Sequence, residues 1–319
     1  MSVKKGLIVL GVFMMLVTGC GEEKKASDVR VKPTDDAQRD KKVEYCDDVL
    51  VSEDEKIIYN IYAQKLGVYD EKKNSWQSIH KNENEFAYKT IGENDMFTVG
   101  NSNYNYFAVM QREKDGLHKK MEIPRKDSAM PLGEYEGEYY FLYNVDDLSE
   151  KLERKIVKWN QEDNQFVDIL KLEDKLVASG VIVKDKIYYA EYQTKLDSYQ
   201  LYEYNIKKKS NKIVREDLPT DYLYNLDESL IWNDGKGNIY SFRGQLYSLG
   251  KQESEVDYNS EYGLFFQTYA DKSKVLVCDV WDAKSGEKKK TVEQFIGYDI
   301  EDDELKLYCN YGVEKIGLK

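Results

Sequence analysis

Beyond residue 43 the chain consists of short apolar runs separated by polar turns. Runs of five to eight residues rich in Tyr, Ile, Val, Leu and Phe alternate with short groups of Lys, Asp, Asn and Gly. Such runs are typical of β-strands, and no window shows the 3.6-residue period of a capped amphipathic helix. We therefore predict an all-β fold built from short strands and regular turns.

A mark, usually an aromatic residue followed by Asp or Asn and a Lys-rich turn, recurs through this region. Clear copies are Val68-Tyr69-Asp70, Lys158-Trp159-Asn160, Glu203-Tyr204-Asn205 and Val280-Trp281-Asp282. With weaker copies included, the marks fall at positions 69, 110, 159, 204, 240, 281 and 319, which are 36 to 49 residues apart. A second signal, a short acidic or Gly-containing turn before an apolar strand, recurs upstream of the marks, as at Asp54–Tyr59 and Lys184–Tyr189.

Spacing of this size is typical of one propeller blade per repeat. We predict a seven-bladed β-propeller with four-stranded antiparallel blades over residues 43–319, with six or eight blades as alternatives. A ring of sheets buries both faces of each sheet against its neighbours, so we expect the marked aromatic residues to pack between blades.

The end of the chain suggests how the ring closes. The last repeat supplies strands near Phe295–Ile300, Leu305–Tyr311 and Val313–Lys319 and then stops before a fourth strand. We expect Lys42–Cys46 to fill that place, so that an N-terminal strand closes the ring. Three prolines are expected in loops between blades, because proline cannot donate a hydrogen bond to a paired strand: Pro124, Pro131 and Pro219.

The first nineteen residues have the organisation of a secretory signal peptide. Lys4 and Lys5 precede an apolar run from Gly6 to Val17, and small residues follow it. A run of about a dozen apolar residues is too short to span a bilayer, which needs about twenty. Residues 1–19 are therefore predicted to be exported and removed.

The sequence Val17-Thr18-Gly19-Cys20 resembles the bacterial lipobox. The resemblance implies lipid attachment to Cys20 and cleavage before it, and two acyl chains make a stable anchor. An ordinary secretory signal with a chance cysteine is the alternative. Residues 20–42 are polar and charged, which predicts a disordered tether between the lipidated cysteine and the propeller.

The repeat resembles the Tyr- and Lys-rich β-propeller lipoproteins of bacteria. Val280–Glu287 is also similar to the blade-ending motif of WD-type and quinoprotein-type propellers. The Gly-His dipeptide of WD repeats is missing and the quinoprotein cofactor residues find no match, so no specific family and no cofactor are assigned. High Lys, Tyr and Glu with only four prolines favours a Gram-positive source and a cell-membrane location on the extracytoplasmic face.

The charge of the chain excludes one class of partner. The net charge is −12, and loss of Lys4 and Lys5 with the signal would make it −14. Such a surface repels nucleic acid, so DNA and RNA are excluded as partners. Three cysteines would remain beside Cys20, on strands expected not to be neighbours, and we predict buried free thiols without a disulfide: Cys46, Cys278 and Cys309.

Candidate chemistry is sparse. His80 and His118 are expected to be surface or turn residues far from the central channel, and the acidic run Asp299–Glu304 is expected to be a hairpin turn, so no catalytic or metal site is predicted. Four tyrosines fall in predicted loops between second and third strands on one face, where their rings can bind a sugar or peptide. These candidates are Tyr104, Tyr106, Tyr192 and Tyr199, with ordinary loop packing as the alternative.

The pattern as a whole predicts a monomeric, non-enzymatic lipoprotein of the cell envelope, membrane-bound through Cys20. Its propeller would act as a binding or scaffold module for a protein, peptide or glycan. The alternative is an envelope enzyme acting on polysaccharide with carboxylates and tyrosines at the channel mouth, for which carboxylates about 5 to 10 Å apart are diagnostic.

Overall fold

The computed structural model describes residues 47–80, 85–89, 95–101, 106–124, 127–145, 153–172, 175–234, 236–250, 254–259 and 261–318. The chain divides into two units, Met1–Glu44 and Tyr45–Lys319, and every described residue belongs to the second. The predicted signal, the tether, Cys20 and Cys46 lie outside the described residues. Within the described ranges, no helix is long and apolar enough to cross a membrane.

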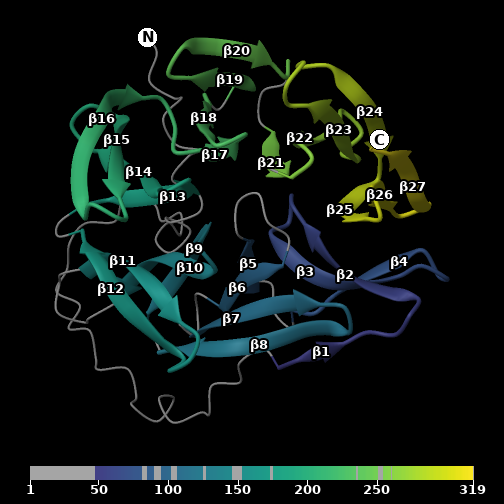
Figure 1. Ribbon diagram of the computed structural model, residues 1–319. Coiled ribbons are helices and arrows are strands. Elements are labelled where there is room, and N and C mark those ends of the chain that lie inside the picture. Colours follow the sequence, from purple (N-terminus) through teal and green to yellow (C-terminus); the bar gives the residue numbers. More distant parts are fainter. Residues whose placement is uncertain are drawn as a thin grey trace, which may run out of the picture. The chain divides into compact units, whose positions relative to one another are not determined.

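The strands form seven antiparallel sheets, which are the blades of a seven-bladed β-propeller (Figure 1). This confirms the predicted fold and number of blades. Blade 1 contains β2 (Glu55–Asn60), β3 (Lys65–Asp70) and β4 (Ser75–Ser78). Blade 2 contains β5 (Glu85–Lys89), β6 (Met96–Asn101), β7 (Tyr106–Glu113) and β8 (Gly116–Ile123), and β1 (Val49–Leu50) pairs with the outer edge of β8.

The next three blades have four strands each. Blade 3 contains β9 (Ser128–Tyr135), β10 (Glu138–Val145), β11 (Glu153–Asn160) and β12 (Gln165–Lys171). Blade 4 contains β13 (Val177–Val183), β14 (Lys186–Gln193), β15 (Ser198–Asn205) and β16 (Ser210–Leu218). Blade 5 contains β17 (Leu223–Leu226), β18 (Ser229–Asn233), β19 (Asn238–Ser241) and β20 (Gly244–Ser248).

Two blades complete the ring. Blade 6 contains β21 (Glu255–Asn259), β22 (Leu264–Ala270), β23 (Leu276–Asp282) and β24 (Lys288–Glu293). Blade 7 contains β25 (Phe295–Glu301), β26 (Glu304–Cys309) and β27 (Gly312–Gly317). In the four-stranded blades the first strand lies innermost and the fourth outermost (Figure 1). The loops between second and third strands and the loops between blades therefore share one face, which we call the loop face.

Blades 1 and 7 are incomplete within the described residues, and in different ways. Tyr69 lies on β3, whereas the other described marks lie on the third strands of their blades, so β2 to β4 correspond to strands two to four. Blade 7 has the first three strands, as predicted, and β25 packs directly against β2. The first described residues run along β8 of blade 2. The predicted closing strand, Lys42–Cys46, lies outside the described residues.

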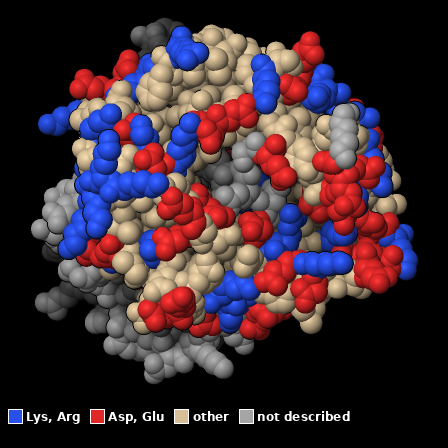
Figure 2. Space-filling view, viewed as in Figure 1, with Lys and Arg blue, Asp and Glu red and all other residues tan. Residues whose placement is uncertain are grey.

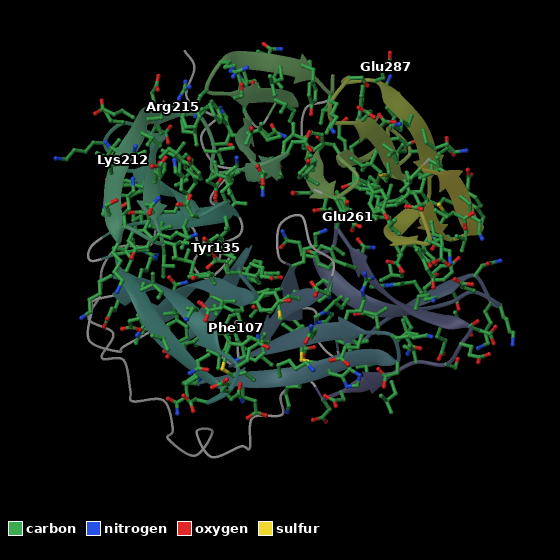
Figure 3. The ribbon with its side chains drawn as sticks, viewed as in Figure 1. Phe107, Tyr135, Lys212, Arg215, Glu261 and Glu287 are labelled. Atoms are coloured by element: carbon green, nitrogen blue, oxygen red, sulfur yellow. The ribbon has the colours of Figure 1, made fainter. Side chains whose placement is uncertain are left out.

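The hydrophobic core is divided into seven clusters, one between each pair of neighbouring blades. Each described mark packs against the preceding blade: Trp159 lies in the cluster between blades 2 and 3, together with Phe107 (Figure 3), and Tyr204 lies in the cluster between blades 3 and 4. The prediction that the marked residues lie between blades is confirmed. The repeated residues of the sequence are thus the ones that make contacts between neighbouring blades.

The smallest cluster closes the ring between blades 7 and 1. It contains four buried residues, Ile58, Tyr69, Ile296 and Tyr308. The Tyr69 and Tyr308 rings meet edge to face with centroids 4.8 Å apart, and the Tyr69 hydroxyl donates to the carbonyl oxygen of Cys309 at 2.9 Å. A buried hydrogen bond therefore supplements a small apolar contact at this joint.

One expectation about a proline was wrong. Pro131 lies within β9, not in a loop; β9 is an innermost strand that pairs only with β10, and Pro131 stands beside a register shift, where a missing N–H is tolerated. Cys278 on β23 and Cys309 on β26 lie on strands that do not pair with each other, although their blades are neighbours and both residues belong to one core cluster. Both thiols are free and buried, and burial raises the pKa of each.

Candidate functional site

The loop face of blade 4 carries the two predicted binding tyrosines whose side chains are described. Tyr192 on β14 lies directly opposite Tyr199 on β15, with ring centroids 5.2 Å apart. Tyr199 is 6% exposed and packs against the Tyr192 ring, whereas Tyr192 is partly exposed. Tyr104 lies outside the described residues; Tyr106 begins β7, and its side chain also lies outside them.

A cavity of about 280 Å³ opens beside Tyr192. Its other lining residues are Leu176, from the loop before β13, Glu191 and Gln193 of β14, and the turn residues Thr194 and Lys195. The backbone N–H of Tyr192 donates to the carbonyl oxygen of Leu176 at 2.8 Å, and the Tyr192 hydroxyl donates to Asp197 at 2.7 Å. The aromatic ring is therefore fixed at both ends, which favours a preformed site.

The loop between β16 and β17 extends this site toward the central channel. The Ser179 hydroxyl donates to the carbonyl oxygen of Asp221, and the Thr220 hydroxyl accepts from the N–H of Tyr222 at 3.1 Å. Burial is the main cause of the raised pKa of Tyr199, and the negative charge of Asp221 and the neighbouring Tyr192 and Tyr222 raise it further. Tyr199 thus lies between the Tyr192 cavity and the Asp221 loop.

Asp221 is a carboxylic acid in an unusual environment. Burial raises its pKa from 3.8 to about 6, and its own backbone amide is the group that opposes this shift. No described lysine or arginine forms an ion pair with it. A carboxyl group whose pKa is raised by desolvation without a cationic partner is a common sign of a functional site.

Three large apolar side chains are exposed on this part of the loop face. Leu176 is 42% exposed, Leu196 is 67% exposed and Tyr222 is 37% exposed. Leu196 lies in the same turn as Asp197, which holds the Tyr192 hydroxyl. We call the five residues Leu176, Tyr192, Leu196, Asp221 and Tyr222 the blade 4 loop surface. Exposed apolar groups around an aromatic cavity are typical of a surface that binds a partner.

A larger cavity, of about 360 Å³, lies on the opposite side of blades 3 and 4 and was not predicted. Tyr135, Tyr140 and Tyr204 line it together with charged residues. Tyr135, labelled in Figure 3, is the last residue of β9. Charged residues at the rim of the cavity form ion pairs, as between Lys158 and Glu138 at 2.6 Å and between Lys207 and Glu136 at 3.1 Å. Tyr204 was recognised in the sequence as a blade mark, but nothing in the repeat indicates that the space beside it stays open.

The central channel contains a buried ion pair that crosses between blades. The Lys89 ammonium at the end of β5 donates to Asp257 on β21, and the Tyr298 hydroxyl on β25 donates to the same carboxylate at 2.9 Å. Burial lowers the pKa of Lys89, and the Asp257 charge opposes that shift. Because these charges satisfy each other, this group ties blades 2, 6 and 7 together. Figure 2 shows further acidic side chains around the central opening, with basic ones toward the outer edge near β16, where Figure 3 labels Lys212 and Arg215.

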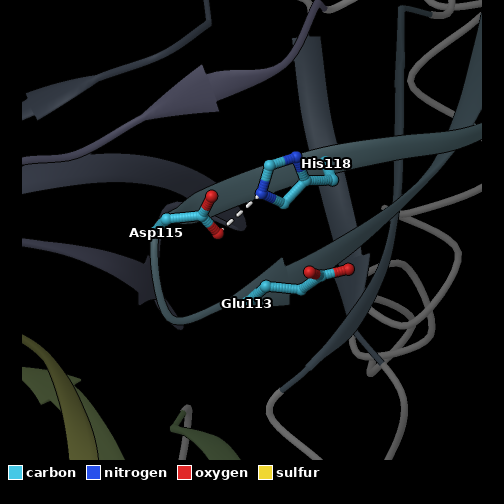
Figure 4. A group of neighbouring side chains, drawn as sticks. All are labelled: Glu113, Asp115 and His118. Atoms are coloured by element: carbon cyan, nitrogen blue, oxygen red, sulfur yellow. Dashed lines mark hydrogen bonds and ion pairs between the residues drawn. The ribbon is translucent and has the colours of Figure 1, made fainter.

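The two histidines differ from each other. His80 was expected at the surface, but its side chain is 1% exposed, and its Nε2 accepts the N–H of Leu66 at 3.0 Å. Burial lowers the pKa of His80 to about 4 and keeps the ring neutral. His118 lies on outer strand β8, as expected, and Figure 4 shows it beside Glu113 and Asp115.

Comparison with known proteins identifies no family. No family model matches the chain, and no curated protein matches it. Among solved structures it is similar to TolB from Acinetobacter baumannii, with a TM-score of 0.48 and 10% identity over 78% of this chain and 66% of that one. It is also similar to the β-propeller domain of the Trilobed protease from Pyrococcus furiosus, with a TM-score of 0.45 and 12% identity over 80% of this chain and 86% of that one.

A third similar structure is a puromycin-hydrolyzing peptidase of Mycobacterium tuberculosis, with a TM-score of 0.45 and 9% identity over 76% of this chain and 44% of that one. The chain thus spans less than half of that peptidase and about two thirds of TolB. The strand pairing itself establishes the propeller.

Proposed function

We propose that this protein is an extracytoplasmic lipoprotein, anchored to the cell membrane through Cys20, whose propeller is a binding module for a protein or peptide. The lipobox-like sequence before Cys20 supports the anchor. The blade 4 loop surface supports the binding role, because it combines exposed apolar side chains with a fixed aromatic ring and a desolvated carboxylate. A partly buried acid that pairs with no described cation favours a partner that brings a basic group.

The main support for this proposal is the exposure of Leu176, Leu196 and Tyr222, so the test replaces these three residues. Leu176→Ser, Leu196→Ser and Tyr222→Ser are combined in one lipidated variant, and partners are captured by crosslinking in intact cells. The matched control is Phe242→Ser with Leu246→Ser, since these side chains are 53% and 45% exposed on the β19–β20 hairpin of blade 5.

We expect one protein partner that the wild type and the hairpin control capture and the loop-surface variant loses. Equal capture by all three forms would remove the blade 4 loop surface from the proposal. Enrichment of free glycan alone would replace the protein partner by a glycan. The anchor is tested separately, because Cys20→Ser should release the protein from the membrane fraction without changing its binding.

One observation favours a second function, an envelope enzyme that acts on polysaccharide. Burial raises the pKa of both Asp221 and Glu255, and both charges act on Tyr222, so two desolvated acids lie near one exposed tyrosine. A carboxyl group with a pKa of about 6 is suited to general acid catalysis. If the wild type degrades cell-wall polysaccharide and Asp221→Asn does not, the protein is an enzyme and the binding-module proposal is rejected. If the wild type shows no such activity, the enzyme proposal is rejected.

A further inference from the structure

The hairpin between β7 and β8 brings together three side chains that bind metals in other proteins. Glu113 ends β7, Asp115 lies in the turn, and His118 projects from β8. One ligand atom from each of the three lies within 4.8 Å of the others. This hairpin is in blade 2, on an outer edge of the propeller and apart from the blade 4 loop surface.

His118 is held in an orientation suited to a metal ligand. Its Nδ1 lies 3.4 Å from an Asp48 oxygen, and the other Asp48 oxygen accepts the backbone N–H of Lys119 at 2.7 Å. The opposite ring nitrogen, Nε2, faces Asp115 at 2.9 Å (Figure 4). A carboxylate behind one ring nitrogen fixes the orientation of the ring, so that a metal can take the place of the proton between the other nitrogen and Asp115. The His118 side chain is only 19% exposed, so this orientation is also fixed by packing.

We propose that Glu113, Asp115 and His118 form a binding site for a divalent transition metal of the zinc class, with Asp48 as the carboxylate that orients His118. An imidazole nitrogen with two carboxylates selects such ions over Ca²⁺ and Mg²⁺, which prefer oxygen ligands alone. Three protein ligands leave a fourth position for water or a partner group.

The geometry requires two small adjustments. Ligand atoms around a tetrahedral zinc ion lie about 3.4 Å apart, given bonds of about 2.0 to 2.2 Å. The Asp115 oxygen and His118 Nε2 are 2.9 Å apart, so they must separate by about half an ångström. The Glu113 carboxylate instead contacts Lys120 Nζ at 2.5 Å, and it is 44% exposed. A rotation of this side chain away from Lys120 completes the set, and the metal replaces the proton shared by His118 and Asp115.

Metal binding here would act on the N-terminal segment. Asp48 directly precedes β1, whose two residues pair with Leu117 and Gly116 of β8. A metal on Nε2 strengthens the hydrogen bond that Nδ1 donates to Asp48, because the metal makes the ring a better donor. The ion would therefore fasten β1 to blade 2, close to the point at which the predicted tether meets the propeller.

The test is a zinc chloride titration of untagged protein with alkylated thiols, using a chromophoric zinc chelator as competitor. We expect one zinc ion per chain. His118→Ala should weaken binding at least 100-fold, and Asp48→Asn should weaken it 10- to 100-fold. His80 remains in every variant and is buried, so it does not take the place of His118.

Glu122→Gln is the matched control, since Glu122 is a partly exposed carboxylate on β8 that contacts Lys119 and lies outside the set. It should bind zinc like the wild type. The visible absorption spectrum of bound Co²⁺ gives a second readout. This spectrum should change in Glu113→Gln even where zinc affinity changes little. No zinc binding by the wild type, or equal binding by wild type and His118→Ala, would overturn the proposal.

Discussion

Replacing Asp221 by asparagine should stabilise the protein at neutral pH. The folded state raises the pKa of this acid from 3.8 to about 6, so folding disfavours its charged form. The penalty develops as the pH rises from 3.8 toward 6 and is complete above that value. A shift of about two pKa units corresponds to about 3 kcal/mol. The substituted amide carries no charge, and its side-chain oxygen can keep the bond to the local backbone amide.

Urea unfolding of wild type and Asp221→Asn at pH 8 and pH 4.5 measures this effect. The variant should gain about 3 kcal/mol at pH 8 but only about 1 kcal/mol at pH 4.5, where the wild-type acid is largely protonated in the folded state. Asp197→Asn controls for the loss of an acid on the same surface, since Asp197 accepts the Tyr192 hydroxyl. An equal effect at both pH values, or destabilisation at pH 8, would refute the reasoning. A stabilising change that also weakens partner capture would identify Asp221 as a residue kept for binding at the expense of stability.

Three further predictions concern the contacts between blades 7 and 1 and the buried His80. A Cβ at Gly297 would lie 2.4 Å from the carbonyl oxygen of Tyr59 in blade 1, so Gly297→Ala should cost about 3 kcal/mol in urea unfolding, whereas Gly317→Ala, with open space around it on the same blade, should be neutral. Tyr69→Phe removes the buried hydroxyl bond across the closing joint and should cost about 1 to 2 kcal/mol, which thermal unfolding will show as a lower Tm. Burial lowers the pKa of His80 to about 4, so the folded state disfavours its charged form. The free energy of unfolding should therefore fall by about 3 kcal/mol as the pH drops from about 6.5 toward 4. His80→Gln should remove this part of the dependence of the free energy of unfolding on pH.

The blades could be predicted from the sequence because the repeat records contacts between blades. A residue such as Trp159 or Tyr204 must be large and apolar to fill the space against the preceding sheet, so its type and spacing persist along the chain. The same logic did not reveal that blade 1 has three strands within the described residues. The mark lies on the third strand of a blade, so it appears at Tyr69 whether or not a first strand is present.

The candidate site was only partly predictable, because loop residues follow no period. Tyr192 and Tyr199 were expected in a loop and lie instead on the facing ends of β14 and β15, and sequence alone does not show that the two rings pack together. Nothing in the sequence around Asp221 indicates that its carboxyl group is desolvated, because this depends on how the loop before β17 packs against β13. Glu113, Asp115 and His118 are close together in the sequence, but the sequence does not show Asp48 beside His118, because Asp48 comes from a segment 70 residues earlier in the chain.

The buried pair in the channel bears on where a ligand binds. Within the described residues, no first strand of blade 1 separates β5 from β25, and Lys89 reaches past this position to Asp257 and Tyr298. A ligand that threaded the channel would have to separate Lys89 from Asp257, and leaving one buried charge unpaired costs about 3 to 5 kcal/mol. The blade 4 loop surface imposes no such cost, because its desolvated acid has no described cation to lose. The proposed binding at the loop face therefore avoids a cost that binding through the channel would carry, and substitution of Lys89 should destabilise the ring more than it affects the proposed partner.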